Sequence, residues 1–262
     1  MKKVYDNCCG IDVHKKLMVA CFIHGKEQEV REFGATTREL LELADWLSKG
    51  GCQMVAMEST ASYWKPLYNI LESSGLKAMV VNARHMKAVP GRKTDVKDSE
   101  WIADLLQHGL LQASYIPDKD QRELRELISY RKSLVQDRTR ELNRLQKMLE
   151  GANIKLSGTI TNINGKSARN IINAILSGTR IDSSKYDEMY DKRIIAHNLK
   201  ASKEQIIDDL NGFMSPLQRK MMKELLMHVD ELDAHIEHLN DDIDKQFLFP
   251  GAVPEDQCSS GQ

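Results

Sequence analysis

The sequence predicts a mixed α/β domain followed by an all-helical region, and three observations support this fold class. Two short apolar runs joined by a polar turn indicate a β-hairpin near the N-terminus. Further strand-like runs then alternate with helical patterns up to about residue 115, which is typical of a mixed sheet with flanking helices. After Pro117 apolar residues recur at alternating intervals of three and four, as in long helices that pair.

The first three strands are predicted from apolar runs and the turns between them. Residues 8–13 and 17–23 are apolar, and the polar His14-Lys15-Lys16 joins them as a hairpin turn. Gly25 permits a second turn, so we expect a third strand at about 28–33. These strands form the start of the sheet.

Helices and strands alternate in the next segment. Thr36 or Thr37 can cap a helix whose apolar positions fall on one face and which stops at Gly50-Gly51. A fourth strand at 54–57 ends in Glu58, a helix follows at about 63–71, and a fifth strand is predicted at 78–81. We therefore expect an α/β domain over residues 1–117.

Two long heptad-like patterns dominate the second half. One runs over 121–149 and the other over 225–243, so an antiparallel coiled coil is expected within a helical region at 118–246. Shorter helices are predicted at about 167–176 and 202–210, opened by Ser167 and Ser202 as N-caps. The Pro-, Gly- and Ser-rich end suggests a disordered tail at 247–262.

Composition and charge restrict the class of protein. Hydrophobic residues make up 41% and charged residues 29%, which is a globular balance. No apolar run is long enough to span a membrane and no secretory signal is visible, so a cytoplasmic protein without membrane contact is expected. The five cysteines lack a metal-type pairing and are expected to be free thiols. A net charge of −1 argues against a protein that coats nucleic acid, but the charge is uneven. Residues 84–97 carry six basic groups, His85 included, against one acid.

Four acidic residues stand out, and each has a structural alternative. Asp12 interrupts an apolar strand, where a carboxylate is costly, or lies in the following turn. Glu58 ends a strand at the edge where α/β sheets bind ligands, or it caps the next helix. Asp95 and Asp98 share one helix face, or they are the N-cap and a first-turn acid.

Together the four acids predict a metal site. Mg²⁺ is a hard ion that prefers carboxylate oxygens, and two such ions can catalyse phosphodiester cleavage. That chemistry needs acids from separate elements at one sheet edge, which Asp12, Glu58, Asp95 and Asp98 can supply. Mn²⁺ is expected to substitute for Mg²⁺. Basic residues nearby can contact the scissile backbone; they are Arg84, Arg92, Lys93 and Lys97.

Three strings around these acids resemble the motifs of a known family. They are Gly10-Ile11-Asp12-Val13-His14-Lys15, Met57-Glu58-Ser59-Thr60 and Lys93-Thr94-Asp95-Val96-Lys97-Asp98. They are similar to the acidic motifs of the DEDD transposases named after insertion sequence one-ten, which are related to the Piv invertases, and the resemblance extends over about residues 8–245. It implies an RNase H-like, RuvC-like domain with Asp12, Glu58, Asp95 and Asp98 as the metal-binding quartet.

The resemblance also implies a function and partners. Family members recombine element ends with target DNA, several are directed by a guide RNA that the element encodes, and their coiled coil mediates dimerisation and nucleic-acid contact. They carry a further module with a serine nucleophile, which does not follow the second heptad pattern here, so a truncated copy is one expectation. The alternatives are a catalytically incompetent DNA- or RNA-binding dimer and a RuvC-like nuclease or resolvase.

Overall fold

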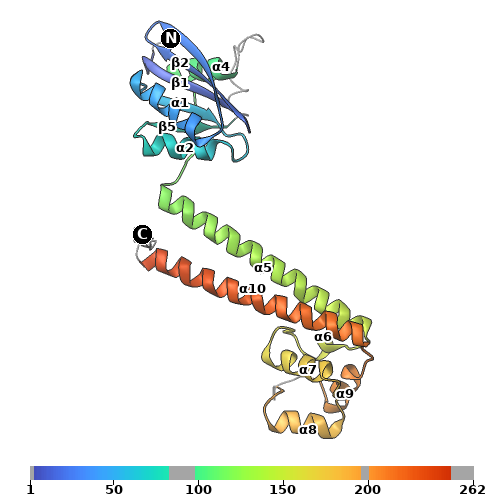
Figure 1. The fold of residues 1–262 in the computed structure, drawn as a ribbon. Helices are drawn as coiled ribbons and strands as arrows, with labels where there is room; N and C mark the ends of the chain where they lie inside the picture. Colours follow the sequence, from blue (N-terminus) through green and yellow to red (C-terminus); the bar gives the residue numbers. More distant parts are fainter. Residues whose placement is uncertain (1–2, 83–97, 196–200, 249–262) are drawn as a thin grey trace, which may run out of the picture. The chain divides into compact units, whose positions relative to one another are not determined.

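The computed structural model describes residues 3–82, 98–195 and 201–248. The chain divides into two compact units, Met1–Pro117 and Asp118–Gln262, here called the sheet unit and the helical unit. Figure 1 shows a strand-rich unit and a unit built from helices alone.

The sheet unit contains one five-stranded mixed sheet. In chain order its strands are β1 (Asn7–Val13), β2 (Leu17–His24), β3 (Glu27–Gly34), β4 (Met54–Glu58) and β5 (Ala78–Val81). In the sheet they lie side by side in the order β3-β2-β1-β4-β5. The first three strands pair antiparallel, whereas β1, β4 and β5 pair parallel. The predicted mixed sheet is therefore confirmed, and the hairpin turn falls at His14-Lys15-Lys16 as expected.

Helices cover both faces of this sheet (Figure 1). Helices α1 (Thr37–Lys49) and α2 (Trp64–Ser73) bury leucines against one face, together with Ile11 and Met57. Helix α4 (Asp98–Gln107) packs on the other face, against Cys8 and Ala56. Thr36 caps α1 by accepting a hydrogen bond from the backbone N–H of Glu39, so the predicted N-cap is confirmed.

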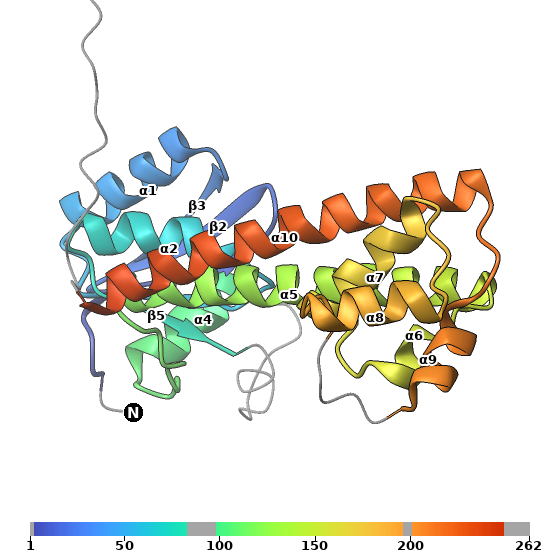
Figure 2. The same ribbon diagram turned by 90° about the horizontal axis from the view of Figure 1, so that it is seen from below.

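Two long helices, α5 (Lys119–Gly151) and α10 (Pro216–Leu248), run antiparallel and side by side in the helical unit (Figures 1 and 2). Arg138 of α5 forms an ion pair of 2.6 Å with Asp233 of α10, and Arg131 donates to Asn240. Both heptad patterns are thus helices that pair, while a coiled-coil supercoil stays a prediction. Helix α10 continues to Leu248, and the tail predicted at 247–262 stays a prediction, because residues 249–262 lie outside the described residues.

Shorter helices fold against one end of this pair around a single apolar core. They are α6 (Leu156–Thr159), α7 (Lys166–Leu176), α8 (Ser183–Asp191) and α9 (Lys203–Leu210). Ser202 caps α9 as predicted, but Ser167 does not cap α7, whose N-cap is Gly165 without a side-chain bond. The helix starts at Lys166, so its N-cap lies two residues before the predicted Ser167. Across the described ranges, no helix is long and apolar enough to cross a membrane.

Candidate metal centre

Asp12 and Glu58 occupy neighbouring positions at the carboxyl edge of the sheet. Strands β1 and β4 pair in parallel with a register that ends at Ile11 opposite Met57, so the next two residues are Asp12 and Glu58. Side chains alternate between the two faces of a strand. Ile11 and Met57 point to the α1–α2 face, so Asp12 and Glu58 belong to the α4 face. The sheet brings these two acids together.

The structure gives both carboxylates polar partners. The side chain of Asp12 is 13% exposed, and its Oδ2 lies 2.9 Å from Nε2 of His14. The hydroxyl of Thr60 donates to Oε1 of Glu58 at 3.2 Å. Asp12 pairs with Val19 inside the hairpin, and the N-cap of α2 is Tyr63. Asp12 therefore belongs to the strand, one residue before its end, although it contacts His14 of the turn, and Glu58 does not cap α2.

Gly10 determines how closely α4 approaches β1. A Cβ atom at this glycine would lie 2.2 Å from the backbone nitrogen of Ala103 and 2.5 Å from the carbonyl oxygen of Ser99. The helix backbone therefore rests directly on the strand. Sequence reasoning did not assign this role to Gly10, although a glycine inside an apolar strand is a known sign of close backbone approach.

The direction of α4 brings its N-terminus to the acidic edge of the sheet. The last residue, Gln107, accepts a hydrogen bond of 2.8 Å from the backbone N–H of Val4, whereas Ser99 lies over Gly10. The helix thus runs antiparallel to β1, and its first residue, Asp98, is at the end of α4 that lies toward Asp12.

The predicted quartet includes one more acid, Asp95. Asp95 lies outside the described residues, as do the basic residues at 84–97. Among the residues that the structure describes, no three His, Cys, Asp or Glu side chains are grouped so as to hold a metal ion. The structure therefore brings Asp12 and Glu58 together and places the N-terminal end of α4, where Asp98 lies, on the same face of the sheet, and the quartet stays a prediction.

The loop after Glu58 contains a strained residue, Ala61, whose φ of 46° is in the left-handed region. Glycine adopts this conformation without a Cβ clash, so we expect Ala61→Gly to raise the free energy of unfolding by about 0.5–1 kcal/mol. The matched control is Ala35→Gly, at a position without positive φ, which should lower stability through unfolded-chain entropy. Urea denaturation measures both, and equal shifts for the two variants contradict the expectation.

A comparison with known families matches a range that begins in β1 of the sheet unit and ends just after α5 of the helical unit. The model of a transposase family, the DEDD transposases of insertion sequence 110, matches residues 9–154, which is more than half of the 262 residues. The chain belongs to this DEDD transposase family. The matched range includes all four acids of the predicted quartet, and it ends well before residue 245, to which the motif resemblance was expected to extend.

Two further comparisons concern curated proteins and solved structures. A comparison with curated proteins finds no match. Among solved structures, RuvC of T. thermophilus in complex with a Holliday junction substrate aligns with a TM-score of 0.31 and 8% identity, over 42% of this chain and 100% of that chain. With the sheet order and the family assignment, the fold class is an RNase H-like mixed sheet with flanking helices.

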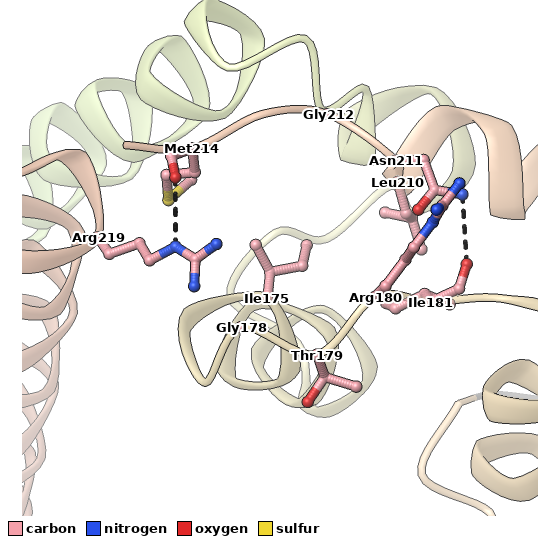
Figure 3. Close-up of a pocket in the computed structure, with 10 residues that line it drawn as sticks. All are labelled: Ile175, Gly178, Thr179, Arg180, Ile181, Leu210, Asn211, Gly212, Met214 and Arg219. Carbon is pink, nitrogen blue, oxygen red and sulfur yellow. Dashed lines mark hydrogen bonds between the residues drawn. The ribbon is translucent and has the colours of Figure 1, made fainter. Parts of the chain in front are cut away.

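A concave site lies in the helical unit (Figure 3). It lies where α7 and α9 end. Two of its polar side chains donate hydrogen bonds to backbone carbonyl oxygens. Arg219 donates to that of Met214 at 3.3 Å, and Asn211 donates to that of Ile181 at 3.4 Å. A Cβ at Gly178 would lie 2.9 Å from Nη1 of Arg219. These contacts close the ends of helices, so the cleft is explained by the fold.

The described cysteines are not candidates for nucleophilic catalysis. Cys8, Cys9, Cys21 and Cys52 are free thiols. Burial raises the pKa of Cys8 and of Cys21 to about 12 and that of Cys52 to about 11. These thiols therefore stay protonated and poorly nucleophilic near neutral pH.

Proposed function

We propose that this protein is a metal-dependent transposase that cleaves and recombines DNA, with Asp12, Glu58, Asp95 and Asp98 as its metal ligands. The observation that carries the proposal is the pairing of Asp12 and Glu58 on one sheet edge, on the face that α4 covers. Membership of a DEDD transposase family supports the reaction class.

The donor set fits Mg²⁺, with Mn²⁺ as a substitute. Carboxylate oxygens are the ligands that Mg²⁺ prefers, and two or three acids suffice because the ion keeps several waters. When bound, the ion supplies Lewis-acid stabilisation of charge on the scissile phosphate. Asp12 and Glu58 bring the oxygens; the contact of His14 with Asp12 and the hydrogen bond that Thr60 donates to Glu58 orient them. Arg84, Arg92, Lys93 and Lys97 are proposed to contact the DNA backbone.

The test uses metal binding and strand cleavage on the same variants. Calorimetry with Mg²⁺ and Mn²⁺, and nicking of supercoiled plasmid DNA, are compared between the native chain and the double variant Asp12→Ala/Asp98→Ala. We expect the double variant to lose both activities. The charge-matched control Asp6→Ala/Asp104→Ala changes exposed acids outside the proposed site and should keep both. Equal metal binding by the native chain and the Asp12→Ala/Asp98→Ala variant refutes the metal role.

A second candidate is a catalytically incompetent protein that only binds DNA or RNA. Binding without strand chemistry, unchanged by the double variant, supports this candidate over the transposase. Nicking of branched DNA that does not depend on element ends instead supports a RuvC-like nuclease or resolvase. A guide RNA and a homo-oligomer formed through the long helices are further parts of the proposal, testable by co-purified RNA and by light scattering.

A further inference from the structure

Three polar side-chain atoms of α4 are buried without a hydrogen-bond partner in the described part of the chain. They are Oγ of Ser99, Nε1 of Trp101 and Nε2 of Gln107. Such atoms cost free energy, and nearly all buried polar groups in folded proteins are paired. Each of these atoms therefore requires an explanation from its surroundings. Ser99 is the most deeply buried of the three residues, with 1% of its surface exposed.

Ser99 lies in the first turn of α4, on the face that packs against the sheet. A Cβ atom at Gly10 would lie 2.5 Å from the carbonyl oxygen of Ser99, so this turn of the helix rests on β1 at that glycine. Asp12 follows Gly10 by two residues and lies on the same face of the strand. The side chains of a helix lean toward its N-terminus, and the N-terminus of α4 lies toward the carboxyl end of β1. The Ser99 hydroxyl thus lies on the Asp12 side of Gly10.

The other two unpaired atoms lie elsewhere on the helix. Gln107 ends α4 at the opposite end of the strands, where its carbonyl oxygen accepts a hydrogen bond of 2.8 Å from the backbone N–H of Val4. Trp101 follows Ser99 by two residues, about 200° around the helix, and is partly exposed. Among these three residues, Ser99 is therefore the one that combines deep burial with a position beside the acidic edge of the sheet.

A hydrated metal ion at the proposed centre would give this hydroxyl a partner. Mg²⁺ held by two or three carboxylates keeps several waters. Such waters donate hydrogen bonds, and a serine oxygen accepts them through either of its two lone pairs. The contact of 2.9 Å between His14 and Asp12 comes from the hairpin turn, whereas Ser99 belongs to α4. The two residues can therefore support the site from different elements.

We propose that Ser99 is a positioning residue of the metal centre, whose hydroxyl accepts a hydrogen bond from a water of the bound ion; this rests on the proposed function and adds a residue to the same site. In the metal-free protein the hydroxyl is buried without a partner among the described residues, so there it lowers stability. Ser99→Ala should therefore stabilise the metal-free fold and weaken metal binding. A serine that only packs the helix does not produce these two opposite effects.

The test measures Mg²⁺ affinity and metal-free stability on the same variants. Calorimetry gives the affinity, and urea denaturation in EDTA, followed by tryptophan fluorescence, gives the stability of the sheet unit, which contains all three tryptophans. Loss of a group that supports metal ligands typically weakens metal affinity about 10–100-fold. We therefore expect Ser99→Ala to bind Mg²⁺ at least about tenfold more weakly than the native chain, and to unfold at a higher urea concentration.

Two matched controls separate the causes. Gln107→Met removes the unpaired amide at the other end of α4 with little change of shape, and should keep the native Mg²⁺ affinity. Ser48→Ala changes an exposed serine of α1 and measures the gain that comes from the helix propensity of alanine alone. The rise in urea midpoint should be larger for Ser99→Ala than for Ser48→Ala.

Three results overturn the inference. They are an unchanged Mg²⁺ affinity in Ser99→Ala, an equal loss of affinity in Gln107→Met, and a urea midpoint of Ser99→Ala in EDTA that rises no more than that of Ser48→Ala. The last result would show that the hydroxyl is already satisfied in the metal-free protein. Weaker Mg²⁺ binding together with the larger rise in midpoint supports the inference.

The outcome is separable from that of the proposed function. If Asp12→Ala/Asp98→Ala abolishes Mg²⁺ binding while Ser99→Ala binds as tightly as the native chain, the metal centre stands and the inference on Ser99 fails. If the native chain binds neither Mg²⁺ nor Mn²⁺, the proposed function fails and the role of Ser99 fails with it.

Discussion

Replacing Gly10 by alanine is expected to lower the free energy of unfolding of the sheet unit by about 3 kcal/mol or more. Overpacking a core typically costs about 1–3 kcal/mol when neighbouring side chains can move. Here the new Cβ would meet backbone atoms of Ala103 and Ser99 at 2.2–2.5 Å, and a helix backbone can move only as a whole. The expected cost is therefore at the upper end of this range or above it.

A matched glycine distinguishes backbone from side-chain crowding. A Cβ at Gly34 would also be close, at 2.3 Å, but to the carboxylate of Glu39, which is the end of a flexible side chain. Gly34→Ala should therefore cost far less than Gly10→Ala in urea denaturation followed by tryptophan fluorescence. Ala103→Gly should not rescue Gly10→Ala, because the contact is with the backbone nitrogen. Equal costs for the two glycine variants contradict this explanation.

The Gly10 variant also bears on the metal centre. Because α4 carries Asp98 and rests on Gly10, a displaced helix moves that acid away from Asp12. Where Gly10→Ala remains folded, its Mg²⁺ affinity should be weaker than that of Gly34→Ala. Equal Mg²⁺ affinity would show that Asp98 does not depend on the close approach of α4.

Leu145→Ala is expected to lower the stability of the helical unit by about 3–5 kcal/mol. Leu145 is completely buried in the core that α5 shares with the short helices. Truncation of such a leucine removes apolar burial and leaves a cavity, with losses of about 3–5 kcal/mol in comparable cores. The control is Leu217→Ala on α10, whose side chain is 67% exposed and should change stability by less than about 0.5 kcal/mol. Urea denaturation followed by far-ultraviolet circular dichroism measures both.

The same variant tests whether the two units fold independently, as the proposed domain division at 117 and 118 requires. All three tryptophans, Trp46, Trp64 and Trp101, lie in the sheet unit. Helical circular dichroism instead reports mainly on the helical unit, which contains both long helices. Leu145→Ala should shift the helical transition and leave the tryptophan transition unchanged. A joint shift of both transitions contradicts independent folding.

Features with a local cause were predictable from the sequence. The strands and the hairpin turn follow from alternating apolar runs and from the polar His14-Lys15-Lys16. Thr36 and Ser202 cap helices through bonds to residues three positions away. Helices α6 and α8 were not predicted; a cue for α8 existed in Asp182, whose side chain accepts from the backbone N–H of Lys185.

The start of α10 shows where a periodicity argument fails. The heptad pattern was expected from residue 225, but the helix begins at Pro216. Its first turns carry Leu217 and Met221, which are exposed, beside the buried Met222. Apolar residues on more than one side of a helix hide the period of its buried face. The short helices of the same unit decide which of these residues is buried.

The sequence by itself determined the strands, the two long helices and which acids could bind a metal, because residue periodicity and capping act over a few positions. Only the tertiary structure decided that Asp12 and Glu58 are neighbours, since the register of β1 with β4 joins segments more than forty residues apart. The approach of α4 over Gly10 is likewise tertiary. Both depend on which faces pack together, and side-chain spacing along one element does not contain that information.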